Sequence, residues 1–469
     1  MENSQLVYLL LALNKGELRE LRKWLISPIH NQREDVVHLF DYLTEKERLN
    51  DEKKLAKTVI FKKLFPKETY DDARLRQAVY FLQKCTEEYL AYREFQRDEI
   101  RSSLALAEVF RRKNLDRLLE KTLKKIQEDL ENGQLKDESY LENQYLFQSI
   151  EYQYISEKKR SPDTNLQAYS DALDLRFIAG KLRIGSLITA VQKVYKQDIS
   201  IGMLEETLNA VEEKGLMRHP AIAVYYYVYK ALSDNTREDY FFRLKETFFL
   251  YGHHFTLEEQ RDILLLAVNY CIAKMNTGAE NFIGEAFDLY KRGIESGALL
   301  DKGVLNHLTF INIVITGATL RQFDWVRWFI QNFQQYLAPQ YRENFVCYSL
   351  AKLHFEQREY AQAQKLLMQF DYDEILFNLS AKSMLIKIYY EEGEYGVLDS
   401  LLESLRTYIN RKKAIAYHKN IYNNLIRFTK RLVRLSPYDK AQKAKLRQEI
   451  EEANPLPERK WLLEQLDNL

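Results

Sequence analysis

One pair of side chains has the types and spacing of a nucleophile and its base. Ser349 and Lys352 stand three positions apart, as the serine and the lysine do in some enzymes that form an acyl intermediate. Such enzymes also carry a K-T-G element, which this sequence lacks, and both residues fall in a segment with helical periodicity. We therefore interpret Ser349 and Lys352 as positions of a structural repeat and predict that the protein is not an enzyme.

A second group contains side chains that bind metal ions in other proteins. His253 and His254 are followed by Glu258 and Glu259, but there is no H-E-x-x-H motif and no set of cysteines and histidines at zinc spacing. The glycines between residues 278 and 303 form none of the patterns that hold phosphate groups. The sequence therefore predicts no metal site, no nucleotide site and no cofactor.

A run of basic residues near the C-terminus could bind anionic groups. With 3.6 residues per helical turn, these cations fall within an arc of about 120°, and apolar residues fill the opposite side. Between Arg406 and Lys445 the sequence has one acidic residue, Asp439. The pattern is typical of a surface that binds phosphates, acidic peptide or anionic headgroups, and also of the solvated face of a helix. The cations of this basic stripe are Lys412, Lys413, Lys419, Arg427, Lys430, Arg431 and Arg434.

The elements that position these residues repeat along the chain. Between residues 345 and 408 matched residue types recur 35 positions apart, and an upstream unit that begins at Phe323 matches at an offset of 37. Each unit has two segments of helical periodicity joined by a short turn. We expect Tyr395 and Leu402 to be core residues. The matched pairs are Leu350 and Leu385, His354 and Tyr389, Arg358 and Gly393, Tyr360 and Tyr395, Ala363 and Leu398, Leu367 and Leu402, and Phe370 and Leu405.

A unit of this length that reads helix, turn, helix resembles the tetratricopeptide repeat (TPR). The resemblance is carried by "YSLAKLHFEQREYAQAQKLLMQF" and "KSMLIKIYYEEGEYGVLDSLLESL". It implies an all-α superhelical stack of antiparallel helix pairs, in which the first helix of each unit lines a concave groove. We expect Lys352 and Lys387, which share one repeat position, to receive a carboxylate or phosphate there. The resemblance places these side chains in the groove: Tyr348, Lys352, Phe355, Ser383, Lys387 and Tyr390.

The first fifth of the chain resembles the N-terminal segment of an uncharacterised bacterial family of TPR-like proteins. The resemblance is carried by "LRKWLISPIHNQREDVVHLFDYL" and "IFKKLFPKETYDDARLRQAVYFLQKCTEEYLAY", and it implies no activity. Two helices around Pro66 could instead read DNA. However, the connection from Pro66 to Asp71 is longer than the turn of a helix-turn-helix motif. The helix that follows also mixes basic and acidic residues, which disfavours DNA recognition.

Capping and breaking signals predict several helix ends. We expect a break near Asn114, a helix that starts at Pro220, and a helix end at residues 276–278. Four tyrosines between residues 225 and 229 point to nearly all sides of one helix, which is typical of a helix buried between neighbours, with an aromatic groove as the alternative. The expected N-caps are Asn31, Asp51, Asp71, Thr256 and Ser436.

The composition limits the class of protein. Only 15 Gly and 8 Pro in 469 residues leave few places for strand turns or linkers. With a formal net charge of +1, the protein has no overall positive potential that would attract nucleic acid or an acidic membrane. No signal peptide or membrane span is recognisable, and Cys85, Cys271 and Cys347 stand far apart. We expect a cytoplasmic protein whose cysteines are reduced core thiols.

These observations predict three segments and one principal function. Residues 1–97 form an N-terminal helical module, residues 98–435 a TPR-like repeat region, and residues 436–469 the C-terminal capping helices. The predicted function is a non-enzymatic scaffold that binds a peptide or protein partner along its concave groove. The alternative is a nucleic-acid-binding regulator that uses the basic stripe.

Overall fold

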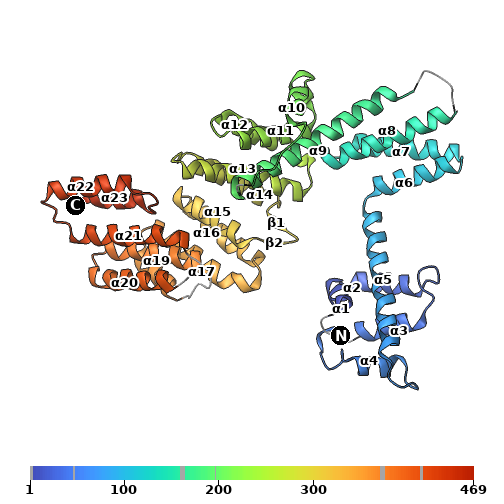
Figure 1. Cartoon of the computed structure of the whole chain (residues 1–469), viewed down its shortest axis with the longest axis horizontal. Helices are drawn as coiled ribbons and strands as arrows, with labels where there is room; N and C mark the ends of the chain where they lie inside the picture. Colours follow the sequence, from blue (N-terminus) through green and yellow to red (C-terminus); the bar gives the residue numbers. More distant parts are fainter. Residues whose placement is uncertain (1–3, 46–47, 159–163, 196, 370–374, 412–415) are drawn as a thin grey trace. The chain divides into compact units, whose positions relative to one another are not determined.

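The structure, a computed structural model, describes residues 4–45, 48–158, 164–195, 197–369, 375–411 and 416–469. Within these ranges the chain is almost entirely α-helical (Figure 1), so the expected all-α class is confirmed. The described strands are β1 (Leu300–Asp301) and β2 (Val304–Leu305), which pair antiparallel. None of the described helices combines the length and the apolar character that crossing a bilayer requires.

The chain divides into two compact units, Met1–Gly180 and Lys181–Leu469, and the division falls inside the helix α9 (Leu166–Tyr195). The segments expected at residues 1–97, 98–435 and 436–469 stay a prediction. The other helices of the first unit are α1 (Gln5–Ala12), α2 (Lys15–Ile26), α3 (Glu34–Thr44), η1 (Arg48–Asn50), α4 (Lys57–Leu64), α5 (Asp72–Arg97), α6 (Glu99–Arg112), α7 (Asp116–Asn132) and α8 (Glu138–Lys158).

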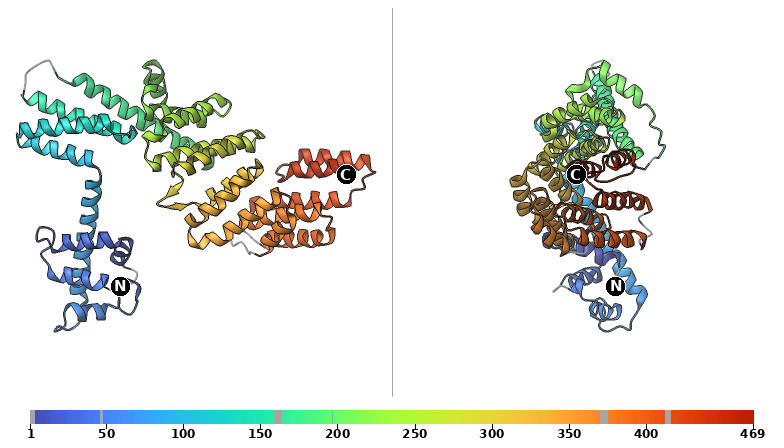
Figure 2. Two further views of the ribbon diagram at one scale, coloured as in Figure 1. Left: turned by 180° about the vertical axis from the view of Figure 1, so that it is seen from behind. Right: turned by 90° about the vertical axis from the view of Figure 1, so that its left-hand side faces the viewer.

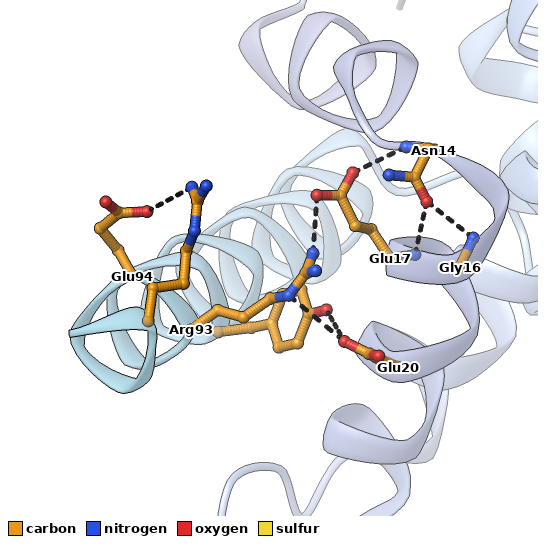
Figure 3. Close-up of polar contacts among 8 residues, drawn as sticks. Asn14, Gly16, Glu17, Glu20, Arg93 and Glu94 are labelled. Atoms are coloured by element: carbon orange, nitrogen blue, oxygen red, sulfur yellow. Dashed lines mark hydrogen bonds and ion pairs between the residues drawn. The ribbon is translucent and has the colours of Figure 1, made fainter. Parts of the chain in front are cut away.

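The helices α1 to α5 enclose one apolar core that extends from Leu6 to Tyr89, and α5 contacts each of the other four. Polar contacts add to this packing. Arg93 of α5 reaches α2, where it donates to Glu17 at 2.6 Å and lies 3.3 Å from Glu20 (Figure 3). Glu17 also accepts the backbone N–H of Asn14 at 2.8 Å, and this bond, followed by that of Arg93, lowers the pKa of Glu17. Asn14 and Glu17 form a capping box at the start of α2, and through Glu17 this box is also bonded to α5.

Two cations of the helix that follows Pro66 are engaged in ion pairs. Arg74 pairs with Glu68, and Arg76 lies 2.9 Å from Asp72. After α5, the helices α6, α7 and α8 form a separate core that includes Leu119. The structure confirms the expected break near Asn114, which has a φ of 54° between α6 and α7.

The second unit continues as a series of helices in which each usually packs on the next. In addition, α15 packs on α17 and α17 packs on α19, so the hairpins α17–α18 and α19–α20 lie side by side (Figure 2). The helices of this unit after α9 are α10 (Leu204–Glu213), η2 (Leu216–Arg218), α11 (Pro220–Ser233), α12 (Glu238–Tyr251), η3 (Gly252–His254), α13 (Leu257–Asn276), α14 (Phe282–Glu295), α15 (His307–Thr319), α16 (Phe323–Phe333), η4 (Gln334–Tyr336), α17 (Pro339–Glu356), α18 (Tyr360–Met368), α19 (Ile375–Glu391), α20 (Tyr395–Arg411), α21 (Ala416–Arg434), α22 (Lys440–Glu452) and α23 (Arg459–Asn468).

Three consecutive hairpins turn in the same way. Arg321, Arg358 and Gly393 have left-handed φ angles of 57°, 60° and 75°. In each turn, the N–H of the following residue donates to the carbonyl five positions before it, at 2.8–2.9 Å, which is the bond that closes a Schellman motif. The left-handed residues are spaced by 358 − 321 = 37 and 393 − 358 = 35 positions, which are the offsets of the sequence repeat. The repeat is thus a repeat of helical hairpins with a common turn.

The N-cap predictions have mixed outcomes. Asp71 caps α5 and Thr256 caps α13, as expected. The predictions for Asn31, Asp51 and Ser436 are wrong because each of these helices begins later, after Arg33, Ala56 and Asp439 respectively. Asn31 and Asp51 instead bond backbone groups of the turns in which they lie. Short-range side-chain bonds can stabilise a turn as well as a helix end.

Burial agrees with some core predictions and corrects one. Tyr225 and Tyr226 of α11 are buried, and Tyr227 and Tyr229 are partly buried, as expected for a helix between neighbours. Leu402 is buried, but Tyr395 is 46% exposed, so the prediction that Tyr395 is a core residue is wrong. Tyr395 is the first residue of α20, and its ring lies beside that of Tyr390 at 5.9 Å.

All three cysteines are unpaired and buried. Burial raises the pKa of the Cys271 thiol to about 12 and that of the Cys347 thiol to about 11, and it also raises the pKa of Cys85. Such thiols stay protonated near neutral pH, which makes them poor nucleophiles and metal ligands.

Candidate partner-binding face

The six side chains predicted to line a groove lie on two neighbouring helices. Three come from α17 and three from α19, and within each helix they are spaced by four and then three positions, which places them on one side. We call this the α17/α19 face. It consists of Tyr348, Lys352, Phe355, Ser383, Lys387 and Tyr390.

The uncharged members of this face are buried. The Tyr348 hydroxyl and Ser380 Oγ are 2.7 Å apart, and Ser383 Oγ donates to the Leu379 carbonyl at 3.1 Å. Burial raises the pKa of Tyr348, and it raises the pKa of Tyr390 to about 12. These groups are therefore covered by protein rather than open to solvent.

The two lysines have different partners although they occupy the same repeat position. Lys352 Nζ donates to Glu356 on its own helix at 2.6 Å. Lys387 forms an ion pair with Glu458, which lies just before α23. Both ammonium groups are 5.4 Å from the centre of the Phe355 ring, so this ring connects the two positions through cation–π contacts.

The C-terminal part of the chain covers the α17/α19 face. Trp461 of α23 packs edge-on against Tyr390 with ring centroids 5.4 Å apart, and its indole N–H donates to Glu391 at 2.8 Å. From α21, Tyr422 interacts with Ser383, and burial, followed by the charge of Glu458, raises the pKa of Tyr422 to about 12. The face thus already holds a carboxylate and an aromatic ring that belong to the same chain.

The basic stripe is partly neutralised. Lys430 lies 3.2 Å from Asp399 and 2.5 Å from Glu403, both on α20, and Arg431 pairs with Glu449 of α22. These bonds raise the pKa of Lys430 and lower the pKa of Glu449. The acidic partners Asp399, Glu403 and Glu449 lie outside the interval from Arg406 to Lys445, in which Asp439 is the one acidic residue of the sequence.

The remaining cations of the stripe have different positions. Lys419, Arg427 and Arg434 are exposed, whereas Lys412 and Lys413 lie outside the described residues. The guanidinium of Arg427 stacks over the ring of its neighbour Phe428 at 4.5 Å. Arg434 reaches a cleft of about 350 Å³ between α21 and α22, which we call the α21/α22 cleft. It is lined by Arg431, Arg434, Leu435, Gln442, Lys445 and Leu446.

The arrangement of the possible catalytic pair favours a structural role. Ser349 is fully buried, and Lys352 is engaged with Glu356. Some enzymes with such a pair also carry a Ser-Asp-Asn element. This sequence occurs here at residues 233–235, at the end of α11, where Asp234 is the C-cap and accepts the N–H of Thr236 at 2.9 Å. The buried Ser349 is therefore not placed as an accessible nucleophile.

The possible metal-binding group is not assembled into a site. Glu259 accepts a hydrogen bond from the Tyr225 hydroxyl at 2.7 Å, and the rings of His253 and His254 are inclined to each other by 40° with their centroids 4.0 Å apart. Across the described ranges, no three or more His, Cys, Asp or Glu side chains are grouped so that they could hold a metal ion.

Sequence reasoning missed the groups that complete the α17/α19 face, namely Glu391, Tyr422, Glu458 and Trp461. Glu391 lies one helical turn after Lys387, so the face itself could have indicated it. No local signal connects Trp461 to Glu391, because the two are 70 residues apart along the chain.

Comparisons with protein-family models, with curated proteins and with solved structures found no match to this chain.

Proposed function

We propose that this protein is a non-enzymatic scaffold that binds a protein or peptide partner on the α17/α19 face, and that its hairpins form a TPR-like superhelix with this face on the concave side. One observation carries the proposal: two lysines and two aromatic rings from matched positions of successive hairpins meet on one face. Repeat proteins use such periodic faces to bind partners, because each unit adds side chains at the same place.

The chemistry of the face supports a polypeptide as the ligand. A lysine provides a cation for a carboxylate, and buried rings provide apolar contact area. A metal ion is a less suitable ligand, since the charged members of the face, Lys352 and Lys387, are themselves cations. Binding here requires that a partner compete with the residues that now cover the face.

Site-specific photo-crosslinking tests the proposal. A crosslinking amino acid is placed at Lys352 or, as a matched control, at Lys365, which is an exposed lysine of α18 in the same hairpin. In an extract of the cells that make the protein, we expect position 352 to give a discrete covalent adduct that position 365 does not give. Lys352→Glu should lower the affinity for the crosslinked partner at least fivefold while helicity by circular dichroism is retained, since it sets a like charge beside Glu356. Adducts at position 365 alone, or an unchanged affinity in Lys352→Glu, would move the binding site elsewhere.

A nucleic-acid-binding regulator is the second candidate, and the α21/α22 cleft favours it. Arg434 and Lys445 are exposed in this cleft beside the Arg431–Glu449 pair. Two cations beside a neutral pair leave a local positive charge that can attract a phosphate. Because Lys430 and Arg431 are paired with carboxylates, fewer cations of the basic stripe are available for phosphates than the sequence alone indicates.

A further inference from the structure

Residues 455–461 contact the α17/α19 face and its neighbours through several specific groups. The Pro455 carbonyl accepts from Asn424 of α21 at 2.9 Å, Glu458 pairs with Lys387, and Trp461 reaches both Tyr390 and Glu391. The Trp461 side chain is 7% exposed, so its ring is almost entirely enclosed. An enclosed tryptophan with its N–H bonded is the usual form of an anchor residue in peptide recognition.

The receptor side of this contact is concentrated on one turn of α19. Lys387, Tyr390 and Glu391 are three and four positions apart, so they share one face of the helix. Lys387 accommodates a carboxylate, Tyr390 offers a ring edge, and Glu391 accepts an indole N–H at 2.8 Å. Together these three residues select a segment in which a carboxylate is followed three residues later by a tryptophan. A segment that lacks either group loses part of these contacts.

The same contacts differ in kind from those that hold α23 in place. Leu462 and Leu466 are fully buried, and α23 packs against α21 and α22. The contacts of Glu458 and Trp461 with α19 are an ion pair, a hydrogen bond and a ring edge. A segment that offers the same two groups therefore competes for Lys387, Tyr390 and Glu391, whereas Leu462 and Leu466 have partners of their own.

We propose that the α17/α19 face recognises a partner segment that carries a carboxylate at the start of a helix and, three residues later, a tryptophan, and that Glu458 and Trp461 occupy this site until such a segment displaces them. The inference rests on the proposed function and names the chemistry of the partner. When a face is covered by its own chain, its apparent affinity for a competing segment is the intrinsic affinity multiplied by the fraction of molecules in which the face is open.

A peptide with the sequence of residues 453–469 is the probe. It is labelled with a fluorophore and titrated against the full chain and against the full chain carrying Glu458→Gln and Trp461→Phe. Gln removes the charge and keeps the shape of the glutamate side chain, and Phe removes the indole N–H and keeps an aromatic ring. We expect the variant chain to bind the peptide about tenfold more tightly than the natural chain does, because its own segment competes less well.

Controls assign the binding to the proposed groups. A peptide that itself carries Glu458→Gln and Trp461→Phe should bind the variant chain at least tenfold more weakly than the natural peptide. Lys387→Met in the variant chain should have a similar effect, whereas Lys365→Met on α18 should have none. The single change Glu458→Gln should give a smaller gain in the same direction, so the test stands even if the double variant loses helicity.

Two results would overturn the inference: equal peptide affinity for the natural and variant chains, or equal affinity of the natural and altered peptides. The outcome is separable from that of the proposed function. A partner that crosslinks at Lys352 but is not displaced by the peptide contradicts only the inference. Specific peptide binding to a chain that captures no partner contradicts only the proposed function.

Discussion

Lys352 and Lys387 stand at equivalent positions of successive hairpins, yet their surroundings give them different roles. Lys352 bonds a glutamate of its own helix, so its charge is balanced locally. Lys387 is balanced by Glu458, which belongs to a segment far along the chain. A partner that competes for Lys387 must therefore replace a carboxylate, and the chemistry of a single residue defines what the partner has to offer.

The contrast between Leu402 and Tyr395 gives a prediction at this scale. Leu402→Ala should lower the free energy of unfolding by about 2–5 kcal/mol, because it leaves a cavity where the buried Leu402 side chain was. Tyr395→Ala should cost about 1 kcal/mol or less, because half of the ring already contacts water. Urea unfolding followed by circular dichroism measures both. A large loss at Tyr395, or none at Leu402, would contradict the burial of these two side chains.

At the scale of elements, the hairpin turn is the feature that repeats. Each turn needs one residue with a left-handed backbone, and the chain uses Gly393 in one hairpin but Arg358 in the preceding one. A side chain beyond glycine costs roughly 1–2 kcal/mol in this conformation, because Cβ approaches the following carbonyl oxygen. The two turns therefore have the same geometry and different strain.

This difference predicts opposite effects for two substitutions. Gly393→Ala should destabilise the chain by roughly 1 kcal/mol from backbone strain alone, since a Cβ there would meet no atom within 4 Å. Arg358→Gly should stabilise it by about 0.5–1 kcal/mol, because the relief of strain exceeds the added entropy of the unfolded chain. Thermal and urea melts of both variants provide the measurement. Changes of the same sign in both would show that backbone strain does not dominate these turns.

At the scale of the whole molecule, charge is balanced overall and uneven locally. The net charge is +1, and three of the cations described on α21 and α22, namely Lys430, Arg431 and Arg447, pair with an acidic side chain of a neighbouring helix. Arg434 and Lys445 are exposed cations of the α21/α22 cleft. Any binding of phosphate groups at the C-terminal end should therefore depend on these two residues more than on Lys430.

Retention on heparin and binding of a labelled single-stranded RNA test this expectation. For each phosphate contact, log affinity falls against log salt with a slope of about −0.7 to −0.9. The pair of changes Arg434→Gln and Lys445→Gln should flatten that slope by roughly two contacts. Lys430→Gln, the matched control, should leave it unchanged because Asp399 and Glu403 already balance that charge. Absence of retention by the natural chain would exclude the second candidate function, and an equal effect of Lys430→Gln would contradict the assignment of the phosphate contacts to Arg434 and Lys445.

The sequence alone determined the helical class, the hairpin repeat and the positions of its turns. These are local properties: the 3.6-residue period defines the helices, and a left-handed residue defines each turn within a few positions. The offsets of 35 and 37 in the residue types therefore reappear as the spacing of Arg321, Arg358 and Gly393. The same locality explains the failed N-caps at Asn31 and Asp51, whose short-range bonds support turns instead.

Only the tertiary structure decided which charges and rings meet. Trp461 contacts Glu391 across 70 residues of chain, and Lys430 meets Glu403 across 27. A helical wheel shows which residues of one helix share a side, but it contains no information about the helix that will face them. The sequence therefore placed six side chains on a common face, and the packing of the C-terminal helices decided that this face is covered. The basic stripe is partly neutral for the same reason, because its acidic partners lie on other helices.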